Sequence, residues 1–282
     1  ILYQGQRDGG GDRNPYATHD WSTVPVRVKN HSYGPNPGYI IQPDFELVIN
    51  ALETSASHGV LHVWAAGNQR GTWGTADSNK IFESVLPPSI VVTALGSDGT
   101  FSEYSSYGAN TFVTAPSSDF PGFSIVTADR TTATEGYNDD PEDPNPYLTS
   151  INEYDYTSTF GGTSSSSPLV AGIMALGVEA NPSMDTRMAK HLMVRTNRIV
   201  DASDSSSTGG WIENAAGNFF NNNYGFGLID AGAFTEEATQ YSGVTDQTTV
   251  ESGELAVNRS FAAEGTNIEE SFNVSLNPSE SQ

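Results

Sequence analysis

The chain has 282 residues and no cysteine, and its 12 Lys and Arg against 34 Asp and Glu give a formal net charge of −22. So negative a field repels nucleic acid and anionic membranes, which argues against both as partners. The lack of cysteine excludes thiol catalysis, cysteine-based zinc sites and disulfides, and no apolar run reaches the ~20 residues that span a membrane. The length suffices for one large domain or two.

Alternating apolar and polar residues predict a first strand at residues 26–32, which ends in a cluster of turn residues at 33–38. Apolar residues then recur at helical spacing between Phe45 and Leu52, and the short apolar run at 60–66 is typical of a buried strand. This strand–helix–strand order predicts a parallel sheet with helices on its faces. Two further strands are expected, at residues 89–95 and 111–115.

Residues 129–155 interrupt this pattern with an acidic, proline-rich stretch that contains Asp139-Asp140-Pro141-Glu142-Asp143-Pro144. We interpret it as a solvated loop. Because oxygen ligands cluster in it, a structural calcium site is the alternative, although the ligands lack a recognisable spacing. From about Val244 the chain changes to short alternating segments, which are typical of a β domain. We therefore divide the chain into residues 1–240 and 241–282.

Four consecutive serines, Ser164 to Ser167, follow Gly161-Gly162-Thr163 and precede Pro168 and an almost wholly apolar segment. The pattern predicts a tight turn that enters a buried helix, with Pro168 in the first helical turn, where no amide partner is lost. At such a position free backbone amides and the positive end of the helix dipole converge, which suits a nucleophile whose reaction develops negative charge. A flexible Ser/Gly linker is the alternative, but a linker would not enter a core helix directly.

Three stretches together resemble the subtilisin-like serine peptidase family. Gly162-Thr163-Ser164-Ser165-Ser166-Ser167-Pro168 resembles its nucleophile motif, Trp64-Ala65-Ala66-Gly67-Asn68 resembles the segment of the oxyanion-hole asparagine, and Asn30-His31-Ser32-Tyr33-Gly34 resembles the substrate-binding strand edge. The resemblance covers roughly residues 20–240 and implies an α/β fold with a mostly parallel sheet flanked by helices. Within the family, the stretch at 224–231 is most similar to the kexin/furin-like branch, so residues 241–282 would form a linker and the beginning of its β-sandwich P-domain.

The resemblance implies a serine endopeptidase that acts on a polypeptide substrate and needs no cofactor for catalysis. It assigns Ser164 as the nucleophile and Asn68, with the backbone amide of Ser164, as the donors to the oxyanion. The implied substrate-binding residues are Ser32, Tyr33, Gly34, Ala65, Ala66 and Gly67. It also implies a secreted or extracellular protein whose signal peptide lies outside this chain.

The chain departs from the family in its catalytic base. The family order is Asp, then His, then Ser, and neither of the first two motifs occurs before Ser164. We therefore expect the catalytic Asp and His upstream of Ile1. The stretch from His58 to His62 superficially resembles the histidine motif, but it lies between a helix and a strand, where Gly59 is better explained as a helix C-cap. Structural positions are expected for the remaining histidines, His19, His31 and His191, because no carboxylate is placed to orient them.

Substrate preference is a second departure. The kexin/furin-like branch prefers basic residues before the scissile bond, which requires carboxylates in the pocket. The turn at 35–38 offers none and leaves Asp77 as the candidate, so the sequence does not support cleavage after arginine. Two other functions stay open: a pseudo-peptidase of the same fold that binds peptides without cutting them, and an acidic secreted structural protein.

Overall fold

The computed structural model describes residues 2–4, 26–34, 45–71, 76–119, 122–130, 136 and 155–245. By its internal contacts the chain divides into two units after Gly243, and the elements below belong to the first. The expected P-domain segment falls almost wholly outside the described residues, as does the acidic stretch at 139–144, so its loop and calcium predictions stay untested.

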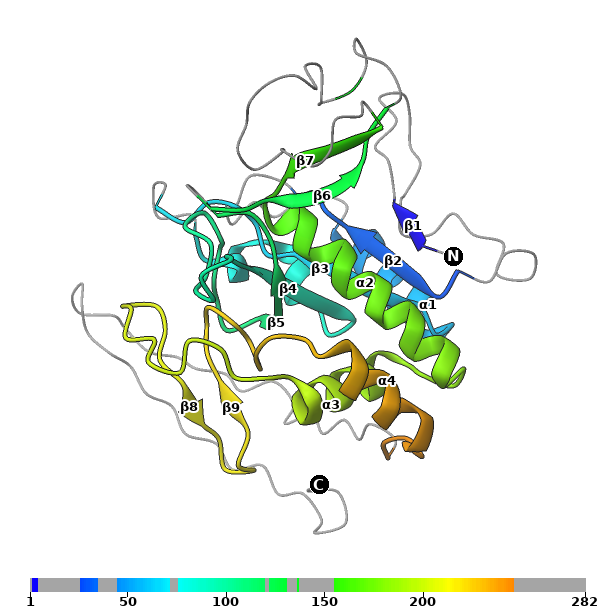
Figure 1. Ribbon diagram of the computed structural model, residues 1–282. Coiled ribbons are helices and arrows are strands. Elements are labelled where there is room, and N and C mark those ends of the chain that lie inside the picture. The colour runs from blue at the N-terminus through cyan, green and yellow to red at the C-terminus, as the bar shows by residue number, and fades with distance from the viewer. Residues whose placement is uncertain are drawn as a thin grey trace, which may run out of the picture. The chain divides into compact units, whose positions relative to one another are not determined.

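A five-stranded parallel sheet forms the centre of the first unit, with its strands in sequence order (Figure 1). The strands are β1 (Leu2–Gln4), β2 (Val28–His31), β3 (Leu61–Ala65), β4 (Ser89–Leu95) and β5 (Thr111–Pro116). The parallel sheet and the four strands from β2 onwards confirm the prediction, while β1 was not predicted. Short apolar runs buried on both faces produce this sheet, as all seven residues of β4 are buried.

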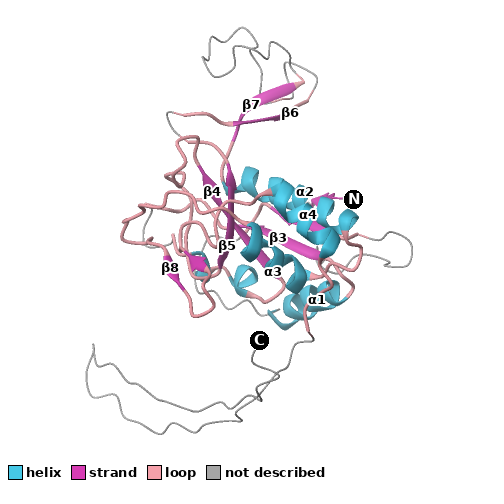
Figure 2. Ribbon diagram, turned by 60° about the horizontal axis from the view of Figure 1, so that its bottom comes forward, coloured by secondary structure: helices cyan, strands magenta, loops and turns pink. Residues whose placement is uncertain are grey.

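Helices cover both faces of the sheet (Figure 2). On one face, Leu61 and Val63 pack with α2 (Thr163–Ala180), α3 (Thr186–Thr196) and α4 (Ala231–Gln240). On the other face, Trp64 packs against Leu52 of α1 (Phe45–Ser57). Successive strand residues point to opposite faces, which explains this separation.

The burial of α2 differs from the expectation. Leu169 and Leu176 are 39% and 50% exposed, so the helix is not buried all round. Its inner side packs on the sheet and on α4, and its outer side faces solvent. The long apolar run therefore forms a helix that is buried on one side only.

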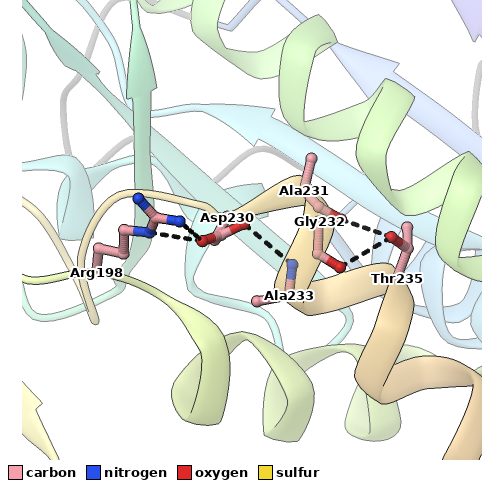
Figure 3. Close-up of polar contacts among 6 residues, drawn as sticks. All are labelled: Arg198, Asp230, Ala231, Gly232, Ala233 and Thr235. Carbon is pink, nitrogen blue, oxygen red and sulfur yellow. Dashed lines mark hydrogen bonds and ion pairs between the residues drawn. The ribbon is translucent and has the colours of Figure 1, made fainter.

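The start of α4 is fixed by polar contacts (Figure 3). Asp230 accepts a hydrogen bond from the Ala233 N–H at 3.0 Å, which caps the helix, and pairs with Arg198. The Thr235 hydroxyl donates to the Ala231 carbonyl at 2.7 Å. The pair with Arg198 joins the start of α4 to the segment that follows α3.

Smaller elements complete the described part. The two antiparallel pairs are β6 (Ile125–Ala128) with β7 (Tyr156–Phe160), and β8 (Ile212–Glu213) with β9 (Phe219–Phe220). Two 3₁₀ turns, Ser78–Lys80 and Phe82–Val85, precede β4. None of the described helices combines the length and the apolar character that a membrane-spanning segment requires.

Candidate active site

Segments that follow β2 and β3 meet the first turn of α2. The Oδ1 atom of Asn68 accepts hydrogen bonds from the Thr163 N–H at 2.9 Å and from the Thr163 hydroxyl at 3.0 Å. The Gly67 N–H donates to the same hydroxyl at 3.1 Å, and the Ser32 hydroxyl donates to the Ser164 carbonyl at 3.0 Å. Parallel strands present their carboxyl ends at one edge, which is where α/β proteins commonly form their sites. The structure thus brings together residues that the sequence motifs singled out separately.

The four serines of the run occupy different environments. Ser165, Ser166 and Ser167 are buried, and each hydroxyl is used inside the protein. Their acceptors are the Gly162 carbonyl at 3.0 Å, the Ala115 carbonyl at 3.1 Å and the Asn30 side chain at 2.6 Å, respectively. Ser164 is partly exposed, and within the described part of the chain its hydroxyl has one long contact, 3.4 Å from the Ser32 carbonyl. Ser164 is therefore the serine of the run whose hydroxyl is not committed to the interior.

Two donors beside Ser164 are also uncommitted. Since Thr163 holds its Oδ1 atom, the exposed side chain of Asn68 has a fixed orientation, and its Nδ2 amide makes no hydrogen bond to the described residues. The Thr163 and Ser165 N–H groups are bonded to Asn68 and to the Gly162 carbonyl, whereas the N–H of Ser164 has no partner among the described residues. A helix start leaves such amides free and adds the positive end of its dipole. The arrangement can therefore donate two hydrogen bonds to an anion.

Gly162 allows Asn68 to approach this closely. Its φ of +75° favours glycine, and a Cβ atom at this position would lie 2.9 Å from Nδ2 of Asn68. Gly162 precedes α2 as its N-cap residue. Any larger residue would both strain the turn and displace the Asn68 amide.

The position of Pro168 corrects the prediction that it lies in the first helical turn. The helix begins at Thr163, so Pro168 is its sixth residue. A proline there has no N–H for the carbonyl four residues earlier, which is that of Ser164. The Ser32 hydroxyl supplies the missing donor at 3.0 Å. A contact between residues far apart in the chain thus makes the interior proline tolerable.

The remaining residues assigned to substrate binding lie along the ends of β2 and β3. Gly34 is exposed, and a Cβ atom there would meet nothing within 4 Å. Tyr33 and Ala65 are partly exposed. Ala66 is buried, and its N–H donates to the Val92 carbonyl at 2.9 Å, so its side chain faces the core and not the open edge.

A buried histidine pair lies beneath the end of β2. Nε2 of His31 is 2.9 Å from Nδ1 of His62, and the outer nitrogens of the pair contact the hydroxyls of Tyr33 at 2.9 Å and Ser55 at 3.0 Å. Burial, and then the charges of His62 and Lys29, hold the pKa of His31 well below its ordinary value. Burial and the charge of Lys29 lower the pKa of His62 to about 3. Both imidazoles are therefore neutral near neutral pH.

No described histidine or carboxylate hydrogen-bonds to the hydroxyl of Ser164, whose one described contact is a carbonyl. His58 follows the last turn of α1, where Nδ1 contacts the Thr54 carbonyl at 2.8 Å, and the φ of +78° at Gly59 agrees with the expected C-cap. His191 is exposed on α3, and His19 lies outside the described residues.

Asp77 has a local structural contact. Its Oδ1 accepts from the Asn79 N–H at 2.9 Å and from the Asn79 side-chain amide at 2.7 Å. The carboxylate therefore caps the 3₁₀ turn that begins at Ser78. This contact uses one carboxylate oxygen of the residue that the sequence left as a candidate for binding basic side chains.

Sequence reasoning missed the residues that support the site from behind. Arg70, two residues after Asn68, donates to the Ser105 carbonyl at 2.6 Å and to Oδ1 of Asn223 at 2.6 Å, and its guanidinium lies 4.0 Å from the ring centroid of Phe101. Tyr104 reaches the turn before α2. These contacts join segments far apart in the chain. The one sequence feature that could have indicated them is the stretch rich in hydroxyl groups at residues 102–107.

Comparison with known proteins identifies the family. A model of the subtilase family matches residues 5–227. The chain belongs to the subtilase family. It is 34% identical over 215 residues to the Aeromonas extracellular serine protease of Aeromonas sobria, covering 66% of this chain and 34% of that protein. It is also 30% identical over 236 residues to human proprotein convertase subtilisin/kexin type 6, covering 79% of this chain and 21% of the relative.

Solved structures agree with this assignment. The crystal structure of the serine protease of Aeromonas sobria matches with a TM-score of 0.68 at 30% identity, covering 78% of this chain and 44% of that one. The subtilase therefore spans less than half of each of these relatives. The convertase among the relatives confirms the predicted likeness to the kexin/furin-like branch.

Proposed function

We propose that the protein is a serine endopeptidase that hydrolyses peptide bonds through an acyl-enzyme on Ser164. One observation carries the proposal: the partly exposed Ser164 hydroxyl lies beside two donors that have no partner among the described residues, the Asn68 side-chain amide and its own backbone N–H. Amide hydrolysis needs a nucleophile together with donors aimed at the developing oxyanion. Membership of the subtilase family and the serine protease relatives support this reaction.

In the proposed reaction, the Ser164 oxygen attacks the scissile carbonyl while its proton passes to a histidine base. The carbonyl oxygen becomes an oxyanion that accepts hydrogen bonds from Asn68 Nδ2 and the Ser164 N–H. The C–N bond then breaks, the amine leaves with the proton, and water hydrolyses the ester by the reverse sequence of proton transfers. We propose that this histidine and its orienting aspartate lie upstream of Ile1 in the complete protein.

We propose that the substrate lies extended between the ends of β2 and β3. The open space beside Gly34 supports this position, and the contacts would come from Ser32, Tyr33 and Gly34 on one side and from 65–67 on the other. The substrate is a polypeptide, in keeping with the relatives named as proteases. We further propose that the protein acts outside the cell and that residues 241–282 form a linker and the beginning of a P-domain.

The test measures hydrolysis of casein and of a peptide library by the full-length protein. Ser164→Ala is expected to abolish turnover, while Ser203→Ala, a change at an exposed serine, leaves it unchanged. Asn68→Asp retains an acceptor for Thr163 but removes the donor, so kcat is expected to fall by about 10²–10³-fold with little change in KM. Full turnover in Ser164→Ala would contradict the proposal. So would the finding that the correctly folded full-length protein binds peptides without cutting them.

A further inference from the structure

One short segment contacts both sides of the proposed oxyanion site. Residues 104–106 lie in the loop between β4 and β5. Towards Asn68, the Ser106 N–H donates to the Gly67 carbonyl at 2.9 Å, and the Arg70 N–H donates to the Tyr104 carbonyl at 3.1 Å. The segment thus holds the loop on both sides of Asn68 by its backbone.

The Tyr104 hydroxyl holds the nucleophile turn from the same segment. It accepts a hydrogen bond from the Gly162 N–H at 3.1 Å and donates to the Ser118 carbonyl at 2.7 Å. The Ser117 hydroxyl lies 2.8 Å from it and donates to the Gly162 carbonyl, also at 2.8 Å. Both backbone polar groups of Gly162, the residue before Thr163, are therefore bound to this hydroxyl cluster.

The Asn68–Thr163 contact and the Tyr104–Gly162 contact together set the orientation of the turn before α2 relative to the Asn68 loop. The contact between Asn68 and Thr163 sets the separation of the two loops at one point, but rotation about that point would still change where the Ser164 N–H is directed. The Tyr104 hydroxyl, held at the end of a rigid ring, supplies the second point. Oxyanion donors act at 2.7–3.1 Å from the developing charge, so a small rotation weakens them.

We propose that Tyr104 is a positioning residue, which sets the angle of the Gly162–Ser164 turn against the Asn68 loop so that both oxyanion donors point to one atom. The inference rests on the proposed function. Tyr104 does not contact the substrate in this account and acts through Gly162. A residue of this kind affects stabilisation of the transition state and leaves binding of the ground state nearly unchanged.

The test is Tyr104→Phe in the full-length protein, which keeps the ring and removes the hydroxyl. We expect kcat to fall about 10-fold, less than for the loss of a whole donor, with KM within about 2-fold of wild type. Tyr241→Phe, which removes a tyrosine hydroxyl after α4, is the matched control and should match wild type. Rates are normalised to the folded fraction measured by circular dichroism, so partial unfolding does not imitate the effect.

A double-mutant cycle with Asn68→Ala separates positioning from a general structural effect. If Tyr104 aligns the two oxyanion donors with each other, Tyr104→Phe should lower kcat several-fold less in the Asn68→Ala background, where one donor remains, than in the wild type. Ser106→Ala removes the hydroxyl that accepts from the Gln69 N–H at 3.2 Å, and it should show the same dependence on Asn68.

The outcomes distinguish the two proposals. An equal fall in kcat with and without Asn68, a wild-type kcat in Tyr104→Phe, or a change confined to KM would overturn the role of Tyr104 and leave the proposed function standing. Absence of Ser164-dependent hydrolysis in the parent protein would overturn both.

Discussion

Replacing Ser32 with alanine removes the hydroxyl that replaces a missing helix hydrogen bond. That hydroxyl donates to the Ser164 carbonyl at 3.0 Å and accepts from the Asn30 side-chain amide at 2.9 Å. The carbonyl has no donor from Pro168, so the substitution leaves it without its replacement. A polar group that loses its partner inside a protein costs about 1–3 kcal/mol. With the Asn30 contact added, Ser32→Ala should lower the free energy of unfolding by about 2–4 kcal/mol.

Replacing Pro168 with alanine should rescue part of this loss. In a Pro168→Ala background, residue 168 has an N–H that can donate to the Ser164 carbonyl along the helix. The part of the cost that belongs to this carbonyl should then be recovered, so Ser32→Ala should become about 1–2 kcal/mol less destabilising. The loss of the contact with Asn30 remains in both backgrounds.

Urea unfolding of the wild type, both single variants and the double variant measures this coupling, with far-UV circular dichroism as the signal. The four free energies form a double-mutant cycle in which independent sites add to within about 0.5 kcal/mol. An equal cost of Ser32→Ala in both backgrounds would refute the view that Ser32 compensates for the proline.

Three further predictions concern stability. The guanidinium of Arg27 donates to the carbonyls of Gly59, Pro182 and Met184 at 3.0, 2.9 and 2.9 Å. Arg27→Ala should therefore lower the free energy of unfolding in urea by about 2–4 kcal/mol. A loss under about 1 kcal/mol would show that these three bonds do not stabilise the fold. Because the folded pKa of His62 is about 3, the unfolded chain takes up the proton first, and stability should fall below about pH 6.5 by about 1.4 kcal/mol per pH unit for this residue; His62→Asn should flatten that dependence, and equal slopes would refute it. The net charge of −22 predicts that the melting temperature rises between about 0.05 and 0.5 M NaCl as repulsion is screened, and a fall would contradict it.

Patterns local in the sequence were sufficient to predict the parallel sheet. The runs at 61–65 and 89–95 are apolar enough to be buried on both faces, and the helix at 45–57 separates two of the strands. Asn68 could be found because residues 64–68 resemble the oxyanion-hole segment of the subtilisin-like family, whereas its position after a buried strand alone fits an ordinary turn residue equally well. These features depend on residues near one another in the chain.

Long-range contacts were not predictable in the same way. Four identical residues in a row cannot be told apart by residue type. Only the packing of β5 and β2 against α2 shows that the hydroxyls of Ser166 and Ser167 form hydrogen bonds in the interior. Pro168 was expected in the first helical turn because a proline further inside leaves a carbonyl without a donor. The donor that the fold supplies, the Ser32 hydroxyl, is distant in the sequence and could not be foreseen. The link from Tyr104 to Gly162 is of the same kind.

The identity of the nucleophile is the central claim, and labelling tests it most directly. The full-length protein is treated with a fluorophosphonate probe, digested and mapped by mass spectrometry. We expect a single adduct on Ser164, which is absent from Ser164→Ala and retained in Ser203→Ala. An adduct on another serine, or no adduct in a folded protein that carries the upstream aspartate and histidine, would contradict it.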